Sequence, residues 1–226
     1  MVQAPLTARA APSRLAGVIV ALAMFHVAAL VSGHVLGNKS SGIGPVIVTL
    51  TVLSFPVIFL TTDLLNEHGG QDVTRRVSAL SVACVGVTFM MVELARLLPA
   101  AGDSHLPPGA FDHVLAVPAV QAAGLLSGYW FGQVADIRIF HWLRAVTAGR
   151  HLWLRALGST SAGELLDGIV VSLFQFAQST AGSGAAPRIG ELDTTWSQAG
   201  IRMGIAIVLL PIVYILHGAI NRRRHR

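Results

Sequence analysis

The sequence predicts an all-α, polytopic membrane protein with six transmembrane helices and both termini in the cytoplasm. Composition, six apolar stretches and an uneven distribution of basic residues predict this fold class. Of the 226 residues, 53% are hydrophobic and only 12% are charged, about half the charged fraction of a soluble domain. The mean hydropathy is +0.64. A water-soluble fold of this length has too little interior to hide so much apolar surface.

Six stretches are long and apolar enough to cross a bilayer, since a hydrocarbon core about 30 Å thick needs roughly 20 helical residues. They are predicted at residues 15–36, 43–62, 77–98, 114–143, 162–181 and 196–220. Together they form one transmembrane domain over residues 13–221. A disordered tail is expected at residues 1–12 and a basic cytoplasmic tail at residues 222–226. The first stretch is too long for the apolar part of a signal peptide.

Basic residues predict the orientation, because Lys and Arg accumulate in cytoplasmic loops. With the N-terminus inside, twelve arginines fall on the cytoplasmic side and four basic residues on the outer side. The cytoplasmic set is Arg9, Arg14, Arg75, Arg76, Arg138, Arg144, Arg150, Arg155, Arg222, Arg223, Arg224 and Arg226, and the outer set is Lys39, Arg96, Arg188 and Arg202. Both termini are therefore expected in the cytoplasm, which requires an even number of spans.

Composition and missing motifs exclude several functional classes. The net charge of +5 does not indicate nucleic-acid binding, because the basic residues lie between apolar runs and not on one face. Cys84 is the single cysteine, so no intrachain disulfide or cysteine metal site is expected. The sequence has no HExxH, Walker A or GxSxG motif. We therefore expect no metal, no cofactor and no enzymatic activity.

Carboxylates inside the predicted spans are the first functional candidates, because a charge in a bilayer is costly. Asp63 and Glu67 are expected at the cytoplasmic end of the second span, where a helix C-terminus disfavours an anion. A cation, a proton or a ligand must then compensate Asp63. Asp136 lies in the fourth span and Asp167 in the fifth. The topology predicts that all three helices bring their carboxylates to a similar depth.

Prolines and several polar residues have structural interpretations that stay open beside functional ones. Pro56, Pro118 and Pro211 fall inside spans and predict kinks. Glu164 follows Ser161 by three positions, which is a capping-box pattern, so it is either a helix cap or a ligand. Glu67 is either solvated at the interface or a ligand, and His26 and His34 either pack or relay protons. Glu93 and Arg96 are expected to form an ion pair at the outer interface.

Three blocks of sequence resemble one bacterial family. The first is Phe55-Pro56, Thr62-Asp63, Asn66-Glu67 and Arg76; the second is Gly132-Gln133, Asp136 and Ile139-Phe140-His141; the third is Leu152-Trp153-Leu154-Arg155, Ser159-Thr160 and Asp167. In these blocks the chain resembles the queuosine precursor transporters, also called the vitamin uptake transporter family. Glu164 and Gly168 depart from the residues usual in that family.

The resemblance implies uptake of a 7-deazaguanine, such as 7-cyano-7-deazaguanine or its aminomethyl relative, across a bacterial inner membrane. A carboxylate can accept the adjacent N–H donors of a guanine-like edge, and aromatic side chains can stack on the planar ring. The implied substrate-binding residues are Phe55, Asp63, Asn66, Glu67, Trp130, Gln133, Asp136, Arg155 and Asp167. The expected partners are this substrate and the lipid bilayer, and a homo-oligomer is left open.

Two other functions compete with this expectation. The first is a substrate-binding membrane subunit of an energy-coupling-factor vitamin importer, which would need partner ATPases for turnover. The second is an intramembrane enzyme that uses Asp63 and Asp136 as an acid pair, although no catalytic motif supports it.

Overall fold

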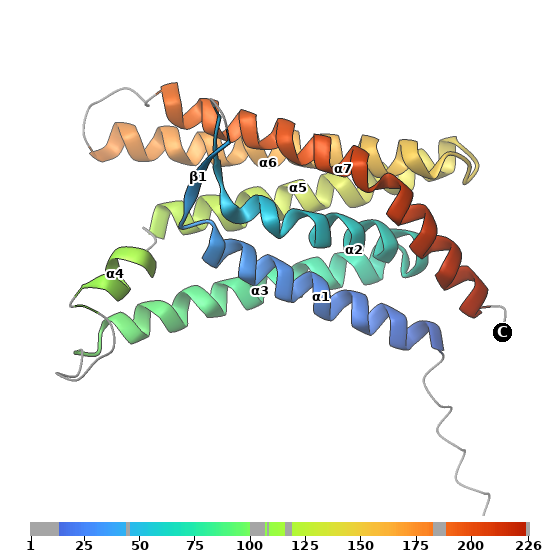
Figure 1. Cartoon of the computed structure of the whole chain (residues 1–226), viewed down its shortest axis with the longest axis horizontal. Helices are drawn as coiled ribbons and strands as arrows, with labels where there is room; N and C mark the ends of the chain where they lie inside the picture. Colours follow the sequence, from blue (N-terminus) through green and yellow to red (C-terminus); the bar gives the residue numbers. More distant parts are fainter. Residues whose placement is uncertain are drawn as a thin grey trace, which may run out of the picture.

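A computed structural model describes residues 14–43, 46–99, 107, 109–115, 119–182 and 189–224 (Figure 1). The predicted disordered tail at residues 1–12 lies outside them. The helices are α1 (Arg14–Leu36), the 3-10 turn η1 (Leu50–Leu53), α2 (Phe55–His68), α3 (Gly70–Arg96), α4 (Ala110–Leu115), α5 (Ala119–Val146), α6 (Leu152–Gly182) and α7 (Ile189–Arg224). Strands β1 (Ser40–Ile43) and β2 (Val46–Thr49) form an antiparallel hairpin. The described fold is thus all-α apart from this hairpin.

The longer helices run roughly along one axis of the molecule. The start of α1, the α2–α3 turn, the α5–α6 turn and the end of α7 gather at one end of the bundle (Figure 1). The β hairpin and α4 lie at the other end. The α2–α3 turn needs Gly70, whose φ of 80° lies in the left-handed region that favours glycine.

Within the part of the chain that the structure describes, three helices are both long and apolar enough to cross a membrane on length and composition alone. They cover Leu15–Leu36, Gly70–Arg96 and Trp196–Arg222. The helices α5 and α6 are also long, with 28 and 31 residues, but they carry the charged residues of the candidate site. The predicted count of six spans therefore stays a prediction.

The second predicted span is shorter than expected. Residues 43–53 belong mainly to the hairpin and η1, and the α-helix α2 covers only 14 residues. The β-branched residues of β2 fit an extended strand as well as they fit a helix. Pro56 lies in the first turn of α2, where proline costs no hydrogen bond, so the predicted kink at this position is wrong.

The ends of two helices also differ from the prediction. α2 continues to His68, and the Gly69 N–H still donates to the Leu65 carbonyl at 2.8 Å. Asp63 therefore lies inside the helix, more than one turn from its C-terminus, where the helix dipole has little effect on a carboxylate. α6 begins at Leu152, ten residues before the predicted span.

α7 bends along its length (Figure 1) and contains Pro211, a residue type that commonly kinks helices. Pro118 lies outside the described residues.

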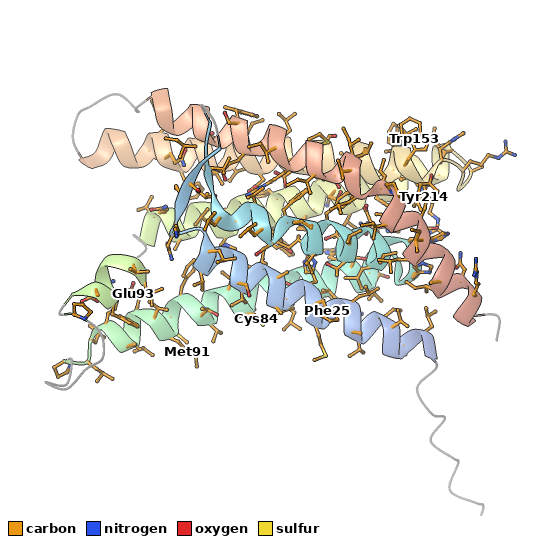
Figure 2. The ribbon with its side chains drawn as sticks, viewed as in Figure 1. Phe25, Cys84, Met91, Glu93, Trp153 and Tyr214 are labelled. Atoms are coloured by element: carbon orange, nitrogen blue, oxygen red, sulfur yellow. The ribbon has the colours of Figure 1, made fainter. Side chains whose placement is uncertain are left out.

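The bundle buries polar side chains beside its apolar core and exposes many large apolar ones, which is the pattern of a protein in lipid. α2 lies centrally and buries eight residues, among them Thr61, Asp63 and Asn66. Phe25 and Met91 are each 64% exposed, and Figure 2 shows them at the edge of the bundle. In water such exposed apolar side chains would be an aggregation hazard. In a bilayer they face the acyl chains.

Aromatic residues are spaced along α7 as expected for the two membrane interfaces. Trp196 and Tyr214 are both exposed, and at 1.5 Å per residue they lie about 27 Å apart along the helix. This separation is close to the thickness of the hydrocarbon core. The Tyr214 hydroxyl accepts a hydrogen bond from the backbone N–H of Trp153 at 3.1 Å, and both residues are labelled in Figure 2. Trp and Tyr are enriched at this depth in membrane proteins.

Candidate functional site

A cavity lies between α2, α5 and α6 near the middle of the bundle. It encloses about 420 Å³ of space between protein atoms, its open mouth included. Its lining residues are Phe55, Ile58, Phe59, Thr62, Tyr129, Gly132, Gln133, Asp136, Thr160, Gly163, Glu164 and Asp167. Four of the nine predicted substrate-binding residues, Phe55, Gln133, Asp136 and Asp167, are among them.

A close approach of α5 and α6 forms one wall of the cavity. An added Cβ on Gly132 would lie 2.9 Å from the Gly163 carbonyl oxygen, and an added Cβ on Gly163 would lie 2.9 Å from the Gly132 oxygen. Gly124 and Gly128 precede Gly132 at four-residue spacing, and their Cβ positions would meet side chains of α6. Small residues at this spacing let membrane helices pack backbone to backbone. The predicted site residues Gln133 and Asp136 are held at this contact.

Polar side chains of the cavity are tied to neighbouring helices. The Ser78 hydroxyl on α3 donates to the Gln133 side-chain oxygen at 3.2 Å. The Asn66 amide on α2 donates to Asp136 Oδ2 at 3.4 Å. These bonds join three helices around the cavity, and they leave the second oxygen of Asp136 without a donor among the described residues.

The aromatic wall of the cavity comes mainly from α2. Phe55 and Phe59 stack with their ring centroids 6.0 Å apart, and both line the cavity. Trp130, which the resemblance implied as a stacking residue, is half-buried and does not line the cavity. Its neighbour Tyr129 does.

Tyr129 connects the cavity to α1 through a buried histidine. The Thr61 hydroxyl donates to the Val57 carbonyl at 2.7 Å, so His26 Nδ1 must donate to Thr61 Oγ1, at 3.0 Å. His26 Nε2 then accepts from the Tyr129 hydroxyl at 2.7 Å. His26 thus packs as a hydrogen-bonded link between α1, α2 and α5.

A second polar cluster lies beside the cavity, nearer the α5–α6 turn. Glu67 Oε2 is 3.2 Å from Arg155 Nη2 and 3.8 Å from Arg144 Nη1. Arg155 is only 2% exposed and its guanidinium lies over the Phe140 ring, 5.3 Å from the centroid. Arg155 is therefore a buried residue of α6 and not a loop charge, although it was counted in the cytoplasmic set. Glu67 is an ion-pair partner and not merely solvated.

Asp63 lies in the same cluster. The residue is 1% exposed. Neither carboxylate oxygen of Asp63 has a hydrogen-bond donor among the described residues. Asp136, Glu67 and Arg155 surround it within electrostatic range.

Sequence reasoning missed one residue that contacts the cavity carboxylates. Arg202 on α7 lies 3.0 Å from Glu164 Oε2 and 3.8 Å from Asp167 Oδ2, and both carboxylates line the cavity. Arg202 had been counted among outer basic residues. Its position six residues inside an apolar run was the available signal, because such a charge needs a partner.

The cap interpretation of Glu164 is wrong. α6 begins ten residues before Ala162, so Ser161 lies inside the helix and its hydroxyl donates to the Leu157 carbonyl at 2.6 Å. Glu164 has no free helix N-terminus to cap and instead pairs with Arg202. The predicted ion pair of Glu93 and Arg96 is present at 2.8 Å, and Asp112 joins it.

Comparisons with known proteins point to membrane transport. A family model described as "Putative vitamin uptake transporter" matches residues 49–216. The "Probable queuosine precursor transporter" of Bacillus subtilis is 27% identical over 168 residues, covering 74% of this chain and 70% of the relative. The "Queuosine precursor transporter" of Escherichia coli is 27% identical over 159 residues, covering 70% and 68%. No solved structure matches the chain significantly.

Proposed function

The chain belongs to the vitamin uptake transporter family, and we propose that it imports a queuosine precursor, a 7-deazaguanine such as 7-cyano-7-deazaguanine, across the inner membrane. The family consists of multi-pass membrane transporters, so the expectation that the chain is not an enzyme is confirmed and the acid-pair enzyme alternative is set aside. The names of both bacterial relatives support this substrate class.

The composition of the cavity is the observation that carries the proposal. Asp136 and Asp167 offer carboxylate oxygens, and Gln133 offers an amide, opposite the Phe55 and Phe59 rings. The Watson–Crick edge of a 7-deazaguanine presents adjacent ring and exocyclic N–H donors beside a carbonyl. In the proposed pose, a carboxylate accepts both donors, the Gln133 amide donates to the carbonyl, and the aromatic wall stacks on the ring.

Asp63, Asn66, Glu67 and Arg155 support the site from outside the cavity lining. In this proposal Asn66 orients Asp136, Arg155 pairs with Glu67, and none of the four residues touches the base. Six spans with both termini in the cytoplasm are also proposed. Support comes from the arginine bias and from helix ends that alternate between the two ends of the bundle (Figure 1).

Uptake in cells that cannot synthesise the precursor tests this function. Cells expressing the chain and supplied with 7-cyano-7-deazaguanine should gain queuosine in their tRNA. Asp167→Asn should abolish this gain, because the cavity loses an acceptor. Glu93→Gln is the matched control, since it neutralises a carboxylate in an exposed ion pair. If no queuosine appears with wild-type protein at normal expression, the proposal is wrong.

Binding to the purified chain tests the recognition of the edge. A 7-deazaguanine should bind at least a hundredfold more tightly than the analogue without the exocyclic amine, because that analogue leaves a buried carboxylate unpaired (the discrimination of such sites reaches about 10⁴). Equal affinities would contradict the pose. Uptake into liposomes by the chain alone separates this function from that of a binding subunit that needs partner ATPases.

A further inference from the structure

Four buried oxygen atoms next to the cavity have no hydrogen-bond donor among the described residues. They are both carboxylate oxygens of Asp63, the Asn66 side-chain oxygen and Asp136 Oδ1. Asp63 and Asn66 are at most 1% exposed. They lie three residues apart on α2 and so share a helix face, and Asn66 is bonded to Asp136. Buried acceptors left in this state are costly unless something positive or protic binds them.

The charges around these oxygens do not balance. The groups that face Asp63 are Glu67 from α2, Asp136 from α5 and Arg155 from α6. Asp136 also faces Glu164 from α6, which pairs with Arg202 from α7. On α1, the His26 ring is occupied by Thr61 and Tyr129. Both nearby guanidiniums, Arg155 and Arg144, pair with Glu67. Among the described residues, no Lys or Arg nitrogen lies within 4.0 Å of Asp63 or Asp136. One further positive charge would leave the cluster close to neutral.

The location of the oxygens decides which ligand they suit. Asp63 and Asn66 do not line the cavity, whereas Asp136 does. A planar base bound in the cavity therefore does not reach Asp63. A proton, or a small cation bound directly by oxygen atoms, suits this position better, because buried acceptors without donors favour a positive or protic ligand.

We propose that Asp63, Asn66 and Asp136 bind one monovalent cation, a proton or Na⁺, and that this cation drives import. The proposal rests on the transport function above. Asp136 faces both the cation site and the substrate cavity, so each ligand changes the charge that the other meets. Such a shared residue makes the two binding equilibria reciprocally linked.

Gradient experiments on the purified full-length chain in liposomes test the proposal. Uptake of labelled 7-cyano-7-deazaguanine is measured with an imposed proton gradient, with an imposed Na⁺ gradient and with neither. One of the two gradients should drive accumulation of the substrate. If one cation is coupled to each substrate molecule, a tenfold cation gradient should concentrate the substrate up to about tenfold. The gradient that acts identifies the cation. Uptake that ignores both gradients overturns the proposal.

The Asp63→Asn variant separates coupling from transport. Counterflow, in which internal unlabelled substrate exchanges for external labelled substrate, needs no driving gradient. Gradient-driven accumulation by Asp63→Asn should fall more than its counterflow, while Glu93→Gln keeps both. An Asp63→Asn variant whose accumulation falls no more than its counterflow overturns the proposal. If Asp63→Asn does not fold, Asn66→Ala replaces it, and its gradient-driven accumulation should fall more than its counterflow. If wild-type protein shows neither counterflow nor binding, the proposed function itself has failed.

Discussion

Arg202 on α7 lies 3.0 Å from Glu164 on α6, and this ion pair joins α7 to the wall of the cavity. The guanidinium also lies 5.9 Å from the centroid of the Phe55 ring. Arg202 is only 18% exposed at its side chain. One cation therefore contacts two carboxylates and an aromatic residue, all three of which line the cavity.

Removing this cation should destabilise the bundle. Arg202→Gln leaves Glu164 and Asp167 unpaired in a low-dielectric site, which should cost about 3 kcal/mol. Arg202→Lys should recover part of this loss, because it keeps the charge without the planar fork. The midpoint of thermal unfolding in detergent measures the effect. Arg96→Gln is the control, since its partners are exposed and its loss should change little. Equal effects of Arg202→Gln and Arg96→Gln would contradict this prediction.

The glycine contact between α5 and α6 should not tolerate a side chain. Gly132→Ala places a methyl group 2.9 Å from the Gly163 oxygen, and such overpacking should cost about 1 to 3 kcal/mol. Substrate binding should weaken as well, because Gln133 and Asp136 move with this segment. Gly204→Ala is the matched control, since nothing lies within 4 Å of the added atom. A thermal midpoint for Gly132→Ala at or above that of Gly204→Ala would show that the helices are not packed this closely.

The hydrogen bond between His26 and Tyr129 should contribute to stability as a pair. Tyr129→Phe leaves a buried imidazole nitrogen without its donor and should cost about 1 to 3 kcal/mol. His26→Leu combined with Tyr129→Phe should cost less than the sum of the two single changes, because no unpaired polar group remains. Chemical unfolding in detergent measures all three variants. Additive losses would mean that the two residues act independently.

The orientation can be tested with the single native cysteine removed. In a Cys84→Ser background, Lys39→Cys and Arg150→Cys place one thiol at each end of the bundle. A membrane-impermeant maleimide should label Lys39→Cys from outside intact cells and Arg150→Cys only from the cytoplasmic side in inverted vesicles. Labelling of both thiols from the same side would contradict the proposed topology.

Much of the helical layout could be predicted from sequence, because apolar length is a strong signal. Helices are found within all six predicted segments. The hairpin could not be predicted, since a short β-branched run such as residues 46–49 suits a strand or a buried helix equally well. The early start of α6 was hidden because Arg155 resembles a loop residue until its partner Glu67 on another helix is known.

The sequence also predicted part of the site. Sequence patterns identified Asp63, Asp136 and Asp167 because charges inside apolar runs are rare. The patterns could not tell which of them share one space, since that depends on helix packing. Trp130 was expected in the cavity because it adjoins the right segment, but a shift of one residue along a helix turns a side chain by about 100°. Arg202 was missed because a charge near the end of a run fits an interface equally well.

The short central helix has an electrical consequence. At 1.5 Å per residue, the 14 residues of α2 extend about 21 Å, whereas the surrounding hydrocarbon is about 30 Å thick. If water reaches both ends of α2, the transmembrane voltage falls across this shorter path. An ion that crosses these roughly 21 Å then does the electrical work of the full membrane potential, about 2.3 kcal/mol per charge at 100 mV. The shorter path makes the electric field along α2 about 1.4 times as strong as it would be across about 30 Å of hydrocarbon, so a small displacement of charge beside α2 does more electrical work.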